Sequence, residues 1–134
     1  MILDDVVKDF ADAHSRTSRE FVWDWWKANS RTRLEEPALV VVIGTRWHED
    51  DLIGRLRSPE HDGDPEDWEV VSFPALAEGE DALGRSEGEP LLSPIVVEDS
   101  DGALARWARV RASVGSYAWA ALFQQRPSPA AGAI

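Results

Sequence analysis

Two adjacent carboxylates near the N-terminus are the first residues whose types suggest chemistry. Asp4 and Asp5 follow the apolar pair Ile2 and Leu3. A carboxylate in such a place can hold Mg²⁺, usually through water, and a second can orient an attacking water molecule. Apolar residues followed by two acids are common, however, so the competing interpretation is a pair of acids at a turn or at the start of a helix.

A second group of candidates is denser and spans residues 44–51, which read Gly-Thr-Arg-Trp-His-Glu-Asp-Asp. Thr45 could sense a phosphate or a metal-bound water, and Arg46 could pair with a phosphate or with one of the two N-terminal aspartates. The structural interpretation of Asp50 and Asp51 is simpler. They fall where the first turn of the next helix is expected, and the helix dipole favours acids there.

His48 and Glu49 invite a metal-site interpretation. No second histidine follows four residues after His48, so the zinc-protease pattern His-Glu-x-x-His is absent, and a lone exposed histidine is the favoured interpretation. A small metal-dependent nuclease built from Asp4, Asp5, His48 and Asp51 remains a further hypothesis, because two-metal sites need clustered carboxylates.

The 134 residues contain no phosphate-binding loop of the Gly-x-x-x-x-Gly-Lys-Ser/Thr type. The only lysines are Lys8 and Lys27, and neither follows a glycine. We therefore expect that this stretch of chain does not cradle a triphosphate in the standard way.

A pair of parallel strands is expected to position these candidates. Residues 38–43 form a continuous, mostly β-branched apolar run, which is typical of a strand buried on both faces. Residues 17–28 are predicted to form a helix that Ser18 can cap, with one apolar face made of Phe21, Val22, Trp25 and Trp26.

A strand, a helix and a second strand in this order favour a parallel sheet with a right-handed crossover. Leu3 and Val41 should then lie on neighbouring strands. Their C-terminal ends would meet at one edge of the sheet, where open α/β sheets bind ligands. That edge would hold Asp4, Asp5, Gly44 and Thr45.

The rest of the chain is predicted to be mixed. We expect a short helix at 49–56, a loop at 58–67, a second strand from Trp68 to Phe73 and an irregular stretch over 75–102. A helix containing Leu104 and Trp107 should break at Gly115, and a last helix should run from about 116 to 125. Among the tryptophans, residues 25, 26, 68 and 107 are predicted to lie in the core. For residues 23, 47 and 119, core packing is favoured over exposure for base stacking.

Composition limits the class of protein. The chain has 43% hydrophobic residues, seven tryptophans and no cysteine. It contains no apolar run near the ~20 residues that cross a bilayer, so a cytoplasmic protein without membrane contact is expected. The net charge of −11 is uneven, because residues 60–101 hold 14 acids against Arg85 alone, whereas residues 102–134 hold four arginines and no acid. A local DNA or subunit contact of that basic segment competes with a solvated helix face, which is favoured.

Several segments together carry a resemblance to a known family. In order they are ILDDVVKDFADAHS, VWDWW, VVVIGTRWHEDDLIGRL, FPALAEGEDALGRSEGEPLL and VGSYAWAALFQQRP. Together they resemble the large terminase subunit of tailed phages and prophages, over residues 2 to about 132. GTRWHEDDL and FQQRP are the specific parts.

The resemblance implies an α/β fold: part of a P-loop NTPase-type parallel sheet with flanking helices, plus a small lid-like α+β subdomain. Residues 1–58 would be the C-terminal half of the ATPase core, 59–126 the lid or transmission subdomain, and 127–134 the linker towards a nuclease domain. Residues 2–5 would be the Walker B strand, with Asp4 serving Mg²⁺ and Asp5 at the catalytic acid. The coupling motif would be Gly44, Thr45 and Arg46.

Two positions depart from the family's pattern: Asp5 stands where many members have glutamate, and Val6 where the related pattern often has proline. The resemblance implies Mg²⁺ and ATP as cofactors of the complete protein, neither expected to bind tightly to this chain alone. It implies viral double-stranded DNA, the portal and the small terminase subunit as partners, in the cytoplasm of a bacterial host. The alternatives are the nuclease above and a non-enzymatic module that docks on terminase or portal, with self-association through exposed sheet surface.

Overall fold

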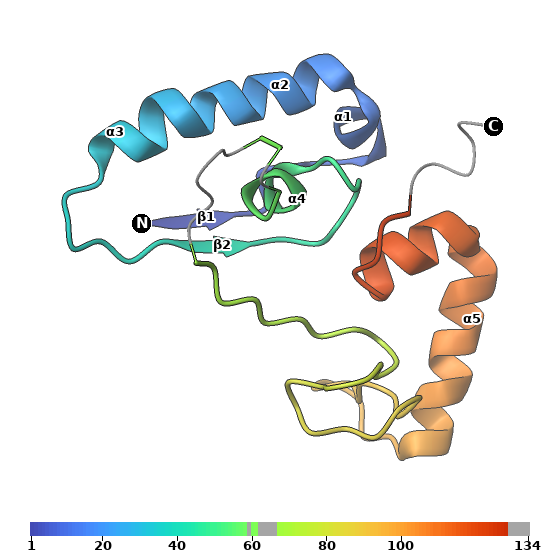
Figure 1. Ribbon diagram of the computed structural model, residues 1–134. Coiled ribbons are helices and arrows are strands. Elements are labelled where there is room, and N and C mark those ends of the chain that lie inside the picture. Colours follow the sequence, from blue (N-terminus) through green and yellow to red (C-terminus); the bar gives the residue numbers. More distant parts are fainter. Residues whose placement is uncertain (59, 62–66, 129–134) are drawn as a thin grey trace. The chain divides into compact units, whose positions relative to one another are not determined.

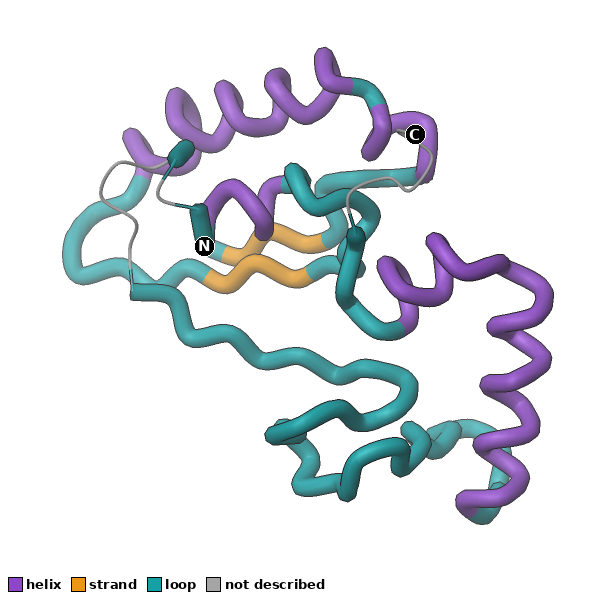
Figure 2. The backbone as a smooth tube through the Cα atoms, turned by 45° about the vertical axis from the view of Figure 1, so that its right-hand side comes forward, coloured by secondary structure: helices purple, strands orange, loops and turns teal. Residues whose placement is uncertain are grey.

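A computed structural model describes residues 1–58, 60–61 and 67–128. The chain divides into two compact units, Met1–Trp68 and Glu69–Ile134, which are taken one at a time below. Figure 1 labels their elements, and Figure 2 distinguishes helices, strands and loops. Within the described residues the fold is mixed helix and strand, with a sheet of two parallel strands.

The sheet of the first unit pairs β1 (Ile2–Asp4) with β2 (Val41–Ile43) in parallel. The register aligns Ile2 with Val41, Leu3 with Val42 and Asp4 with Ile43. The predicted parallel pairing is confirmed, with Leu3 and Val41 one position apart. The second strand is shorter than the expected 38–43, because its first three residues make no ladder with β1.

The connection between the strands is helical. It consists of α1 (Phe10–His14), α2 (Arg16–Trp25), the π-helical turn η1 (Trp26–Ser30) and α3 (Arg31–Arg33). The predicted cap of the long helix was wrong by one turn. Ser15 is the N-cap of α2, and its side chain accepts a hydrogen bond from the backbone N–H of Ser18 at 3.2 Å.

The core of this unit lies between the sheet and the helices, with α2 and α4 (Leu52–Leu56) on the same side of the strands (Figures 1 and 2). Its buried members are Leu3, Trp23, Trp26, Leu52 and Leu56. The predicted apolar face of the helix was partly wrong, since Phe21 and Trp25 are 70% and 38% exposed. The buried positions are instead residues 23, 26 and 30, three and four residues apart.

The other face of the sheet is open in this unit. Ile2, Val41 and Ile43 are 69%, 37% and 51% exposed, whereas Leu3 points into the core. Burial of the second strand on both faces, expected from its continuous apolar run, is therefore not found. Helices cover only one face of the two-stranded sheet.

The second unit is built around α5 (Ser100–Ala118), which continues into the π-helical turn η2 (Trp119–Phe123). Gly115 has φ of 84°, which confirms the predicted break there. The predicted strand over 68–73 was wrong: no ladder forms there, and Val70, Val71 and Phe73 are half exposed. Alternating sequence alone does not make a strand when no neighbouring strand supplies hydrogen bonds.

A hairpin-like loop packs against η2. Backbone hydrogen bonds join Ala77 to Glu89 and Leu91 to Ala75, and the N–H of Ala75 donates to the carbonyl of Phe123 at 2.8 Å. Residues 75–99 are otherwise irregular, as predicted. The predicted loop at 58–67 and linker at 127–134 lie partly outside the described residues. None of the described helices is long and apolar enough to span a membrane.

Candidate functional site

The C-terminal ends of β1 and β2 bring several predicted residues together. The N–H of Asp5 donates to the carbonyl of Ile43 at 2.9 Å, which extends the pairing one residue beyond the strands. Asp5, Gly44 and Thr45 line one pocket at this edge, joined by Asp51. Asp4 is exposed and does not line the pocket, so the structure separates the two adjacent aspartates.

This pocket is small. Its cavity volume is about 20 Å³, which accommodates about one water molecule rather than a nucleotide. Its polar lining residues are two aspartates and a threonine, and its apolar lining residues come from β2, α4 and the residues after β1. Among the described residues, no three or more His, Cys, Asp or Glu side chains are grouped so that they could hold a metal ion.

Asp5 has an unusual backbone. Its φ is 51°, in the left-handed region that L-residues other than Gly, Asn and Asp rarely adopt. The chain turns sharply here, directly after the strand. The backbone thus places the Asp5 carboxylate at the sheet edge at a conformational cost.

Arg46 does not pair with Asp4 or Asp5 as the sequence suggested. Its Nε donates to both carboxylate oxygens of Asp51, at 3.0 and 2.9 Å. The Asp51 side chain also accepts from the backbone N–H of Gly54 at 2.8 Å and so caps α4. Asp51 therefore precedes the helix instead of lying in its first turn. One buried carboxylate fixes both the start of α4 and the position of Arg46.

Gly54 is required by the close packing of this turn. A Cβ built on Gly54 would lie 1.9 Å from the carbonyl oxygen of Glu49 and 3.1 Å from Nη2 of Arg46. The Glu49 carbonyl belongs to the backbone, so it could not move aside for this Cβ as the end of a flexible side chain could. The spacing of Arg46, Asp51 and Gly54 in the sequence is thus explained by one tightly packed turn.

His48 is half-buried, not exposed as predicted. Its Nδ1 accepts a hydrogen bond from the backbone N–H of Asp50 at 3.0 Å, and its ring meets the edge of His14 with centroids 5.0 Å apart. Burial lowers the pKa of His48, and the charges of Arg19 and His14 lower it further. The neutral ring is therefore favoured, and its Nδ1 lone pair serves the backbone.

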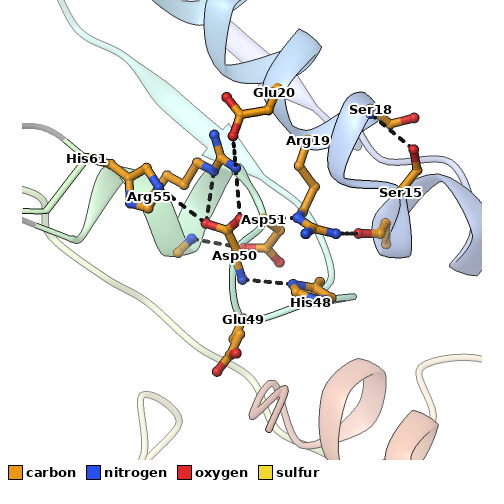
Figure 3. Close-up of polar contacts among 12 residues, drawn as sticks. Ser15, Ser18, Arg19, Glu20, His48, Glu49, Asp50, Asp51, Arg55 and His61 are labelled. Atoms are coloured by element: carbon orange, nitrogen blue, oxygen red, sulfur yellow. Dashed lines mark hydrogen bonds and ion pairs between the residues drawn. The ribbon is translucent and has the colours of Figure 1, made fainter. Parts of the chain in front are cut away.

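An ion cluster that the sequence analysis missed surrounds Asp50 (Figure 3). Arg55, whose side chain is 2% exposed, donates through Nε and Nη2 to the two Asp50 oxygens at 2.9 and 2.8 Å. Its Nη2 also contacts Glu20 at 3.1 Å. Arg19 reaches the same Asp50 carboxylate at 3.2 Å. The cluster ties α2, the 44–51 segment and α4 together.

The charges in this cluster support one another. Burial raises the pKa of Asp50, but the hydrogen bonds and charge of Arg55 outweigh it and hold that pKa below its usual value. Burial also lowers the pKa of Arg55, and Asp50 and Glu20 more than restore it. Nη1 of Arg55 is buried without a hydrogen-bond partner in the described structure. A buried cation of this kind is costly to leave unpaired, so Arg55 depends on the carboxylates of Asp50 and Glu20.

The FQQRP segment forms a second ordered site, in the other unit. The Gln124 side chain accepts from the backbone N–H of Leu76 at 2.8 Å and donates to the Leu76 carbonyl at 3.0 Å. Its amide also donates to Glu78, which receives Arg126 at 2.7 and 2.8 Å. The amide of Gln124 thus bonds to the backbone as a neighbouring strand would.

Neither the Asp50–Arg55 cluster nor the Gln124–Leu76 pairing was found by sequence reasoning. Asp50 and Arg55 are only five residues apart, but Glu20 and Arg55 are 35 apart and Leu76 and Gln124 are 48 apart, so local spacing does not reveal these two long-range contacts. The one local signal available was Asp51 followed by Gly54 at capping distance.

Comparison with protein-family models, with curated proteins and with solved structures found no match to this chain.

Proposed function

We propose that this chain is part of the large terminase subunit, the ATP-driven motor that packages viral DNA into procapsids. The observation that carries the proposal is the parallel pairing of β1 and β2, because it puts Asp5 and Thr45 around one pocket at the C-terminal edge of the sheet. Ligands of open α/β sheets bind at this edge. The segments resembling the Walker B strand and the coupling motif are the ones that meet there.

The pocket residues supply part of a donor set for Mg²⁺, which is usually bound by one or two carboxylates together with waters and substrate phosphates. Asp5 has a carboxylate and Thr45 a hydroxyl, whereas both oxygens of Asp51 already accept hydrogen bonds from Arg46. By the resemblance, Asp4 would hold the ion through water and Asp5 would orient the attacking water. Asp5 lines the pocket and Asp4 does not, so the pocket supports the role of Asp5 alone. Phosphate binding would need a glycine-rich loop, which these 134 residues do not contain.

Thr45 and Arg46 would couple ATP hydrolysis to movement. The clamp of Arg46 by Asp51 supports this role, since it links the edge of the sheet rigidly to α4. The partners in this proposal are viral double-stranded DNA, the portal and the small terminase subunit, in the cytoplasm of a bacterial host.

The test begins with the coding DNA on both sides of this sequence, read in all frames for a Gly-Lys-Ser/Thr loop. A polypeptide carrying that loop is then co-expressed with the chain, and ATP turnover is measured. We expect turnover to need both parts and to fall at least ~100-fold with Asp5→Ala, the scale of losing a catalytic acid or base. Asp24→Ala, at an exposed site on α2, is the matched control.

Two outcomes would overturn the proposal. One is an adjacent reading frame without any phosphate loop. The other is turnover that Asp5→Ala leaves unchanged. Turnover by the chain alone, abolished by Asp5→Ala, would instead show that these residues suffice for activity.

The open face of the sheet favours a second candidate, a non-enzymatic interaction module. Ile2, Val41 and Ile43 form an apolar surface of a kind that parallel sheets normally cover. Size-exclusion chromatography with light scattering tests it: a dimer or larger species supports the module, and a clean monomer counts against it.

A further inference from the structure

Three consecutive aliphatic side chains project into solvent from the loop that leads into α5. Ile95, Val96 and Val97 are 89%, 62% and 103% exposed, and we name these three residues the apolar tip. Single exposed aliphatic residues are ordinary, but a cluster on one loop marks an interaction site.

The apolar tip is held rigidly. The Ser93 hydroxyl accepts hydrogen bonds from the N–H groups of Ile95 and Val96, both at 3.1 Å. At the other end of the tip, the Glu98 carboxylate accepts from the N–H of Ser93 at 2.8 Å. These bonds close the loop on itself and hold the backbone of the tip.

Two side chains of α5, Arg106 and Trp107, support this loop. Arg106 contacts Glu98 through Nε and Nη2, the shortest contact being 2.6 Å, and also donates to the carbonyl of Leu91 at 3.1 Å. Trp107 donates to the same carbonyl at 2.9 Å and stacks with Arg106, whose guanidinium carbon lies 4.3 Å from the ring centroid. A preorganised loop loses little conformational entropy on binding, which favours a role in recognition.

The charges beside the apolar tip select the class of partner. Asp99 and Asp101 lie two and four residues beyond the tip and are exposed. Arg106 is paired with Glu98, and the charge of Arg109 also lowers the pKa of Glu98. Within the second unit, residues 69–101 carry nine acids and one arginine. Such a surface is repelled by nucleic acid and by anionic membranes.

We propose that the apolar tip is a docking element for a protein whose apolar pocket is flanked by lysine or arginine side chains. The aliphatic side chains would fill the pocket, and Asp99 and Asp101 would meet its basic rim. The inference does not depend on the packaging function, because it uses no residue of the sheet edge.

The test uses the intact chain and a phage-displayed library of random 12-residue peptides. Selected peptides are expected to combine aromatic or aliphatic residues with Lys or Arg. Ile95→Ser/Val97→Ser should weaken their binding at least ~10-fold, as loss of interface anchors does. Leu83→Ser, at a 54% exposed leucine in the same unit, is the matched control and should leave binding unchanged.

The charge of the rim is tested separately. Asp99→Asn/Asp101→Asn keeps a capping side chain on α5 while removing both charges. We expect weaker binding of the selected peptides and a smaller loss of affinity when salt is raised. Unchanged circular dichroism of each variant shows that the fold is retained.

Four results would contradict the proposal. Peptides could bind the Ile95→Ser/Val97→Ser variant as well as the original chain. Binding could be indifferent to Asp99→Asn/Asp101→Asn. The chain could sediment with phosphatidylserine vesicles through the tip, or self-associate through it in analytical ultracentrifugation, which would identify a membrane or a second copy as the occupant.

Discussion

Asp5 lines the pocket at the sheet edge and has a backbone conformation that favours glycine. Because its φ is 51°, a residue with a Cβ pays a conformational cost there that glycine avoids. Asp5→Gly should therefore leave the free energy of unfolding unchanged or raised, and Asp5→Ala should lower it by about 1 kcal/mol. Urea denaturation followed by tryptophan fluorescence measures both. Equal stability of the two variants would show that the left-handed backbone is not strained.

His48 makes stability depend on pH. Its folded-state pKa lies below the ordinary 6.5, so the unfolded chain takes up a proton first as the pH falls. The stability contributed by neutral His48 is complete above pH 6.5 and is lost as the pH drops from there through the folded pKa. Asparagine can accept the same bond from the N–H of Asp50 but does not titrate.

We therefore expect His48→Asn to flatten the loss of unfolding free energy between pH 7 and 5. Urea denaturation at a series of pH values gives the slopes. His61→Asn serves as the control. His61 contacts the same residue in a different way, because its Nε2 lies 3.6 Å from the Asp50 carboxylate and not at the Asp50 backbone N–H. A slope that His48→Asn leaves unchanged would assign the pH dependence to other groups.

At the scale of elements, α4 and α5 begin alike and differ in one contact. Asp51 and Asp99 each cap a helix by accepting from the N–H of a glycine three residues on, at 2.8 Å in both. Asp51 also holds Arg46. Asp99→Ala should cost its helix about 1 kcal/mol for the cap alone. Asp51→Ala should cost about 3 kcal/mol, because the part-buried Arg46 loses the carboxylate that its Nε contacts as well.

Hydrogen–deuterium exchange at the N–H groups of Gly54 and Gly102 measures this difference, because each amide reports the local stability of its own helix start. Arg46→Met in the background of Asp51→Ala is the control and should recover part of the loss. Equal costs for the two capping residues would mean that the Arg46–Asp51 contact adds nothing to stability.

Sequence reasoning worked best where local pattern decides the structure. The parallel strands, the break at Gly115 and the irregular loop before α5 follow from apolar runs and from glycine, and all are present. The strand expected at 68–73 failed because its alternation describes side chains, whereas a strand also needs a partner. The pairing of Arg46 was missed for a related reason: Asp51 competes for it at short range, and only the turn around Gly54 shows this.

At the scale of the whole molecule, the same kind of substitution should change stability differently on the two faces of the sheet. Val42 packs against the core, and its neighbour Ile43 is 51% exposed on the open face. Val42→Thr should cost about 1 kcal/mol or more, because it places a hydroxyl in an apolar site. Ile43→Thr should change stability by less than about 0.5 kcal/mol and raise solubility.

Urea denaturation and precipitation by polyethylene glycol check the two effects. If Ile43→Thr destabilised the protein as much as Val42→Thr, the open face would be covered in solution. The same measurement thus distinguishes an isolated sheet from one that is already part of an assembly.

The pairing of Gln124 with Leu76 has a mechanical consequence. The Gln124 amide bonds to Leu76 on both sides, and two residues later Arg126 grips Glu78, so neighbouring anchors join the chain near Pro127 to residues 76–78. A tensile force applied to the chain beyond Pro127 would be shared among these bonds and passed to the loop, instead of unwinding η2 from its end. Residues 124–126 are therefore the place where a force on the C-terminal segment would be transmitted to the rest of its unit.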